Sequence, residues 1–179
     1  VSLVLLVGSG LFAASVRNLR TLDIGIGRER ELLVWTVPGQ TGVRDDAMVN
    51  LWQRIQERLS AVPGVVAVGA SNQAILNGGL NGMDVPGVMM TVEGEPPKST
   101  TRNGGRSFVT PGFFDAAGIR LIAGREFTER DRENASYVVI INASMARFHF
   151  GTESAAVGRM VRFPGPTKQA QQIVGVIND

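Results

Sequence analysis

The hydrophobic pattern opens with an uncharged apolar run over residues 1–16, VSLVLLVGSGLFAASV. A helix needs about 20 apolar residues to cross a bilayer, so the run predicts the C-terminal part of a transmembrane helix over residues 1–18. Small residues recur along it, as helix packing within membranes favours. Two alternatives stay open, a buried soluble helix and the core of a signal peptide, although a signal peptide would also carry a basic segment before the run.

The clearest amphipathic helix lies further along the chain. Its apolar residues recur at helical spacing, and they are Met48, Leu51, Trp52, Ile55, Leu59 and Val62. Asp45 and Asp46 supply negative charge to the first turn, and Pro63-Gly64 ends the pattern. Trp52 lies on the apolar face, and we interpret it as a core residue.

Short runs rich in β-branched and aromatic residues predict strands on both sides of this helix. They are residues 32–37 (LLVWTV), 65–70, 88–93, 137–141, 158–163 and 172–177, and the last two form a hairpin across Pro164-Gly165-Pro166. Residues 73–87 and 95–105 are rich in Gly, Asn and other polar residues, which predicts loops.

A short helix is predicted within residues 107–131. Thr110 suits its N-cap and Pro111 its first helical position, where the missing N–H has no consequence. Gly118 is free to take the left-handed position that closes the helix. Residues 119–127 then resume an extended, half-buried pattern.

A second short helix over residues 143–150 has its own signals, with Asn142 as the N-cap and Gly151 as the closing residue. Short β-α-β units with one clear amphipathic helix favour an α+β fold, a mixed sheet with helices packed on one face. The 179 residues suffice for one domain or two small lobes. The chain begins inside an apolar run and ends directly after a strand-like segment, so we expect a fragment cut at both ends and marginally stable by itself.

Charge and cysteine content exclude several classes of function. The net charge is +2, and the basic residues are dispersed, without the clustered stripe that nucleic-acid binding requires. The absence of cysteine excludes disulfide scaffolds, thiolate metal sites and cysteine nucleophiles.

The titratable residues do not form a convincing site. His149 is the only histidine and lies between two phenylalanines, so we interpret it as a partly buried structural residue. An acidic turn suggests a paired-carboxylate or Ca²⁺ site, but its acids alternate with arginines and lack the EF-hand spacing, which favours a charge-balanced, solvated turn. The acids are Glu126, Glu129, Asp131 and Glu133, and the arginines are Arg125, Arg130 and Arg132.

The remaining motifs are equally weak. Ser107, Ser136 and Ser144 have no G-x-S-x-G context, and the glycines of residues 78–82 match no phosphate-binding motif. Asn134 and Asn142 each begin a glycosylation triplet, although Asn142 has a better use as a helix cap. We therefore predict no catalytic, cofactor-binding or metal-ligating residue, no cofactor and no enzyme activity.

Six segments taken in order carry a family resemblance. They are VSLVLLVGSGLFAASVRNL, PGVVAVGAS, FVTPGFFDAAGIRLIAGREFTERD, VVIINASMARFHF, AVGRMVRF and QQIVGVIND. Together they resemble the MacB-like periplasmic core domain of FtsX-like ABC transporter permeases, with the closest likeness to the second copy in tandem permeases. The resemblance covers nearly the whole chain, although no single motif in it is specific.

This resemblance implies a domain organisation. Residues 1–18 become the end of a transmembrane helix, 19–31 a connector, and 32–179 a two-lobed periplasmic core domain that is incomplete at its C-terminus. The protein is then expected in the bacterial inner membrane. Arg17 and Arg20 argue against this orientation, because positive charge beside a membrane helix favours the cytoplasm. The ordered match outweighs two arginines.

The resemblance also implies a function. The domain is expected to be non-catalytic and to transmit ATP-driven movement of the membrane helices to the periplasm, for efflux or extraction of a substrate. The implied partners are a cytoplasmic ABC ATPase subunit, a second permease half or copy, membrane lipid and, in the efflux branch, a periplasmic adaptor protein. A nucleic-acid partner is not expected. The alternative is a membrane-anchored extracytoplasmic binding or interaction domain without ATPase coupling.

Overall fold

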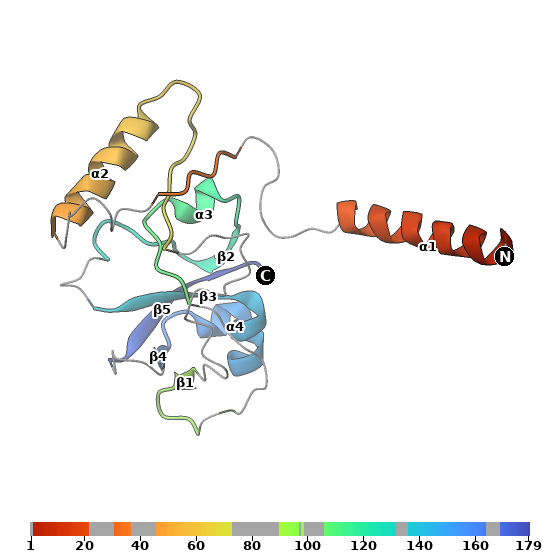
Figure 1. Cartoon of the computed structure of the whole chain (residues 1–179). Coiled ribbons are helices and arrows are strands. Elements are labelled where there is room, and N and C mark those ends of the chain that lie inside the picture. The colour runs from red at the N-terminus through yellow and green to blue at the C-terminus, as the bar shows by residue number, and fades with distance from the viewer. Residues whose placement is uncertain are drawn as a thin grey trace.

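Strand β5 (Gln171–Ile177) is the centre of a five-stranded mixed sheet (Figure 1). The computed structural model describes residues 2–21, 31–36, 46–72, 90–96, 98, 106–131, 136–163 and 169–179. β5 pairs in parallel with β3 (Val138–Asn142) and antiparallel with β2 (Leu121–Gly124) and β4 (Met160–Arg162). β1 (Thr91–Val92) pairs antiparallel with β4. These pairings confirm the predicted mixed sheet and its C-terminal hairpin, whose turn lies outside the described residues.

Two short helices pack against one face of this sheet. They are α4 (Ala143–Phe150) and α5 (Glu153–Ala156), and Ala146 and Ala156 are fully buried where they meet the strands. Small side chains let the helices approach the β-branched residues of the sheet closely, and the contacts stabilise the fold through burial of apolar surface. The shared core consists of Met90, Val92, Ile141, Ala143, Ala146, Ala156, Val161, Phe163, Ile173 and Val176. The predicted α+β fold with helices on one sheet face is confirmed.

A close approach between two strands depends on glycine. A Cβ atom at Gly175 would overlap the carbonyl oxygen of Arg125, and one at Gly124 would overlap the carbonyl oxygen of Val174. Gly124 also has a positive φ of 79°, which other residues adopt only with strain. Arg125 N donates to Val174 O at 2.9 Å across this contact. The backbones of β2 and β5, which are neighbours in the sheet, therefore lie very close together, with no side chain between them.

The short helix α3 (Phe113–Ala116) begins later than predicted. Its N-cap position is Gly112, which makes no side-chain cap bond, so the predicted cap at Thr110 is wrong. The Thr110 hydroxyl instead accepts from Ala70 N at 2.9 Å, because a neighbouring segment competes for it. The C-terminal prediction is confirmed. Gly118 has φ of 62°, and the bonds from Gly118 N and Ile119 N form a Schellman motif.

The amphipathic helix α2 (Asp46–Ser60) is confirmed, but its apolar face is only half-covered. Trp52, predicted to be a core residue, is partly exposed. The strand predicted over residues 65–70 is wrong, because these residues have no assigned secondary structure and only one isolated bridge follows them, between Ser71 and Val109. The strand predicted over residues 32–37 is likewise not formed by residues 32–36, which have no ladder partner among the described residues.

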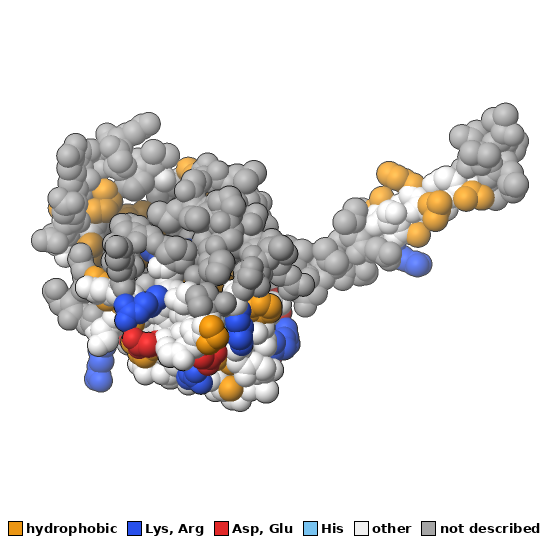
Figure 2. Space-filling model, turned by 90° about the horizontal axis from the view of Figure 1, so that it is seen from below, with side chains coloured by type: hydrophobic (Ala, Val, Ile, Leu, Met, Phe, Trp, Pro, Cys, Tyr) orange, Lys and Arg blue, Asp and Glu red, His pale blue; other side chains and the backbone are white. Residues whose placement is uncertain are grey.

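Helix α1 (Ser2–Thr21) projects away from the rest of the chain (Figure 1). Figure 2 shows hydrophobic side chains along the projecting helix. Leu11 and Phe12 of α1 are 65% and 72% exposed. Within the part of the chain that the structure describes, no helix combines the length and apolarity needed to cross a membrane. The helix runs past the predicted boundary at residue 18, and residues 22–30 of the predicted connector lie outside the described residues.

Candidate functional site

The N-terminus of α4 is where strand β3 turns directly into a helix. The first backbone N–H groups of any helix lack partners within it, so this end requires acceptors. Asn142 is the last residue of β3 and the predicted N-cap, and its side-chain oxygen accepts from Met145 N at 3.2 Å. At the other end, Gly151 N donates to Arg147 O, which confirms the predicted closing residue. Asn142 is thus a helix cap.

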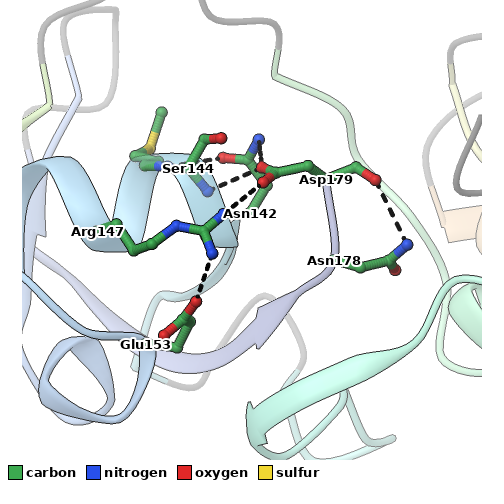
Figure 3. Close-up of polar contacts among 7 residues, drawn as sticks. Asn142, Ser144, Arg147, Glu153, Asn178 and Asp179 are labelled. Atoms are coloured by element: carbon green, nitrogen blue, oxygen red, sulfur yellow. Dashed lines mark hydrogen bonds and ion pairs between the residues drawn. The ribbon is translucent and has the colours of Figure 1, made fainter.

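Asp179, just beyond β5, completes the cap from another part of the chain (Figure 3). One oxygen of its carboxylate accepts from Ser144 N at 2.8 Å and from Asn142 Nδ2 at 2.9 Å. The other oxygen accepts from Arg147 Nη2 at 2.8 Å. A carboxylate at a helix N-terminus also interacts favourably with the helix dipole. These contacts tie the end of the central strand to the helix that covers the sheet.

Arg147 extends the network to the second helix. Its Nη1 donates to Glu153 Oε1 at 3.0 Å, so one guanidinium joins the carboxylates of Asp179 and Glu153. Burial acts to raise the pKa of Asp179, but the hydrogen bonds from Ser144 and the charge of Arg147 outweigh it, and the net pKa lies below the usual value. Asp179 is therefore ionised at neutral pH, with its charge compensated. Such a group binds neighbours and is poorly suited to proton transfer.

Asn178 ties the same end of β5 to the entrance of β2. Its backbone N–H donates to Arg120 O at 3.0 Å, and its side-chain oxygen accepts from Arg120 N at 2.8 Å. Asn178 and Asp179 together fasten the end of the central strand to β2 on one side and to α4 on the other. We refer to Asn142, Arg147, Glu153, Asn178 and Asp179 as the β5 junction.

The acidic turn is closed by an ion pair, as its alternating charges suggest. Arg125 donates to both oxygens of Asp131, at 2.7 and 2.9 Å, and Thr128 donates to one of them through its N–H and its hydroxyl. The bonds from Arg125 are the main reason that the pKa of Asp131 falls to about 2. Burial, followed by the charge of Asp115, raises the pKa of Glu126. Glu133 and Arg132 lie outside the described residues.

His149 is buried, as its position between two phenylalanines suggests. The ring centroids of His149 and Phe148 are 4.9 Å apart in an edge-to-face arrangement. Burial, followed by the nearby charge of Lys98, lowers the pKa of His149, while Glu95 acts in the opposite direction. Lys98 Nζ donates to the backbone carbonyl of His149 at 2.7 Å. The imidazole is therefore a neutral packing group at neutral pH.

The other residues considered from sequence make surface contacts. The Ser107 hydroxyl lies 2.7 Å from the Ser71 hydroxyl and donates to Asn72 Oδ1, while Ser144 contributes its backbone N–H to the β5 junction. Asn134 and the glycines of residues 78–82 lie outside the described residues. Across the described ranges, no group of three or more His, Asp or Glu side chains is placed to hold a metal ion.

Sequence reasoning found the cap at Asn142 and missed Asp179, Arg147 and Asn178. The Asn142 signal is local, because a cap lies beside its helix in the chain. Asp179 lies 37 residues from Asn142, and only the parallel pairing of β3 with β5 brings them together. The Asn-Asp pair after an apolar strand was a usable signal, because side chains at the ends of paired strands meet at one sheet edge.

Charges on the surface are paired across strands. Arg159 contacts Glu95 at 2.6 Å and Arg162 contacts Glu93 at 2.9 Å, which links β4 to the segment that begins at β1. Figure 2 shows basic and acidic side chains side by side on this face of the molecule. Such exposed pairs contribute little to stability, about 0–1 kcal/mol each.

Comparison with known proteins points to one family. The family described as MacB-like periplasmic core domain matches residues 1–179. No curated protein matches the chain.

Three solved structures are similar to the chain. The periplasmic region of MacB from Actinobacillus actinomycetemcomitans is 20% identical, with 71% of this chain and 50% of that one covered and a TM-score of 0.44. The extracellular domain of the noncanonic ABC-type transporter YknZ from Gram-positive bacteria is 24% identical, with 71% and 57% covered and a TM-score of 0.42. A domain of a putative permease protein from Porphyromonas gingivalis is 24% identical, with 52% and 39% covered and a TM-score of 0.36. The chain thus spans about half the length of the structures it matches.

Proposed function

Because the chain belongs to the family of MacB-like periplasmic core domains, we propose that it transmits ATP-driven movement of membrane helices to the periplasm. It does so as a non-catalytic domain of an FtsX-like ABC transporter permease, for efflux or extraction of a substrate. The observation that carries the proposal is the family match over residues 1–179.

A transmitting domain requires a part that moves as one body. The buried contacts of α4 and α5 with the sheet, and the β5 junction that fastens the end of β5 to β2 and α4, support such a role. Packed interiors deform little, so a displacement applied at one edge of the sheet reaches the other edge. The ionised groups of the junction are compensated and serve this connection.

In this proposal α1 is the C-terminal part of a transmembrane helix, and residues after it connect it to the domain. Val7, Leu11 and Phe12 of the helix are exposed, as apolar side chains of a helix in contact with lipid are. The partners are a cytoplasmic ABC ATPase subunit, a second permease half or copy, membrane lipid and a periplasmic adaptor protein. The protein is placed in the bacterial inner membrane, with the domain in the periplasm.

The test measures movement of the sheet layer relative to the membrane during ATP hydrolysis, because a movement that is passed on in full leaves distances within the chain unchanged. The chain has no cysteine, so one spin label is placed by Ser154→Cys on α5, and spin-labelled lipid headgroups mark the membrane surface. Ser154 is exposed. Distances are recorded by electron paramagnetic resonance in the intact permease, reconstituted with its ATPase, with any cysteine elsewhere replaced.

We expect the distance distribution to shift when ATP and vanadate trap the ATPase dimer. A distribution that is identical with and without ATP, in preparations that hydrolyse ATP, would contradict transmission. A catalytically inactive ATPase serves as the control and should leave the distribution unchanged.

A further inference from the structure

Gln56 joins helix α2 to two later segments of the chain. Its side-chain Nε2 donates to Val68 O and to Pro111 O, each at 3.0 Å. Both hydrogens of the amide are therefore engaged. The two acceptors lie 12 and 55 residues further along the chain, so one side chain on α2 holds both.

The two acceptors belong to a tight crossing of backbones. A Cβ atom at Gly69 would overlap the backbone of Phe113, and one at Gly112 would lie 3.1 Å from Val68 O. Gly112 also has a positive φ of 79°. Two segments that cross this closely have no side chains between them, so their relative position is fixed. The amide of Gln56 spans the crossing and connects α2 to it.

The crossing continues into the sheet layer. Thr110 N donates to Ala70 O at 2.9 Å and Asn72 N donates to Phe108 O at 3.0 Å, which extends the contact on one side. On the other side, the chain passes through α3, where Phe114 is buried, into β2. A force on Val68 and Pro111 therefore reaches β2 and β5 through bonded and packed groups.

Apolar contacts hold α2 only loosely. Leu51, Trp52 and Ile55 are partly exposed, and no described side chain of α2 is buried. Val49 is 56% exposed. A helix without a buried face depends more on its polar contacts for its orientation than a core helix does.

We propose that Gln56 is the joint through which movement of α2 is passed to the sheet. α2 is the first helix after α1 among the described residues, so in the proposed function movement of α1 passes along the chain to α2 before it reaches the sheet. Coupling between distant parts of a protein is carried by contiguous hydrogen bonds and packed elements, and Gln56 supplies such a contact for a helix with no buried side chain among those described. This inference rests on the proposed transmission function.

The first test is hydrogen exchange in the intact permease with Gln56→Met, which keeps the length of the side chain and removes both donors. Gln53→Met is the matched control, because Gln53 lies on the same helix, is partly buried and forms no side-chain hydrogen bond among the described residues. Protection of α2 amides should fall about tenfold in Gln56→Met, the effect of losing one to two net hydrogen bonds. Peptides from β5 should keep their protection in both variants. Equal α2 protection in the two variants overturns the joint.

The second test separates this inference from the proposed function. The distance between a label at Ser154→Cys and spin-labelled lipid headgroups is recorded with and without ATP in three backgrounds: wild type, Gln56→Met and Gln53→Met. If Gln56 passes the movement to the sheet, ATP shifts the measured distance in wild type and Gln53→Met, and it shifts the distance less in Gln56→Met. A full shift in all three leaves transmission standing and overturns the role of Gln56. No shift in wild type overturns transmission itself.

Discussion

Asp179 is the residue that connects the β5 junction, because its carboxylate accepts hydrogen bonds from the backbone, an amide and a guanidinium at once. Its side chain is 41% exposed, so solvent weakens the ion pair and the helix-cap bonds are its main contribution. Arg147 is more exposed still, at 53%. We therefore expect the loss of any one partner side chain to destabilise the fold less than the loss of the Asp179 carboxylate.

Replacement of Asp179 by Ala should lower the free energy of unfolding by about 1–2 kcal/mol, the loss typical of a helix N-cap. Glu153→Gln should have a smaller effect, because it weakens only one exposed contact of Arg147. Urea titrations followed by circular dichroism give both values. Equal losses in the two variants would mean that the ion pairs matter more than the cap.

The lowered pKa of His149 predicts that the free energy of unfolding depends on pH, and it gives the sign of that dependence. Its pKa in the folded chain lies below the unfolded value of about 6.5, so the unfolded state binds more protons between the two. The contribution of His149 to stability is therefore fully present above the unfolded pKa, and it is lost as the pH falls toward the folded pKa. Asp131, with a pKa of about 2, stays ionised throughout this range.

The measurement compares urea midpoints of wild type and His149→Phe between pH 8 and pH 5.5. We expect the midpoint of wild type to fall more steeply with acidification, because Phe retains the apolar packing and has no proton to bind. The difference between the two curves isolates His149 from the carboxylates. Parallel curves would show that the imidazole is solvated enough to titrate normally.

At the scale of elements, the contact between β2 and β5 is the most sensitive to added volume. A methyl group at Gly175 must displace the Arg125 carbonyl, so we expect Gly175→Ala to destabilise the fold by about 1–3 kcal/mol or more. Gly158→Ala is the control, since its Cβ meets no atom within 4 Å and only the positive φ of 85° opposes it. Thermal unfolding checks both, and a smaller loss for Gly175→Ala than for the control would contradict the steric account.

Helices with local signals were predictable, but the strands expected over residues 32–37 and 65–70 are not formed in the described residues. Contacts between distant segments were not predictable either. The caps at Asn142 and Gly151 follow from adjacent residues, and the helix over Asp46–Ser60 follows from its period. The prediction of Thr110 as a cap was wrong because the Thr110 hydroxyl accepts a hydrogen bond from Ala70 N, which lies 40 residues away in the chain. The β5 junction and the Gln56 contact both depend on which strands and segments lie together, which period and capping do not reveal.

At the scale of the whole molecule, several large apolar side chains outside α1 and the sheet are exposed. They are Leu32, Leu33, Val34, Trp35, Val49, Leu59, Val62, Val66 and Phe108. Exposed apolar side chains favour association between copies. We expect the 179-residue chain by itself to associate as its concentration rises, in sedimentation velocity. Val34→Lys should reduce this more than Ser154→Lys, and a monomer at all concentrations would contradict the expectation.

The position of the sheet layer relative to the membrane is the central claim. A single cysteine at Ser154 on α5 reports it, because the chain has no other cysteine and Ser154 is exposed. The intact permease is treated in cells with a membrane-impermeant maleimide after the outer membrane is permeabilised. Labelling at this stage is the predicted result and places the domain in the periplasm. Labelling only after the inner membrane is broken would place it in the cytoplasm and contradict the proposed function.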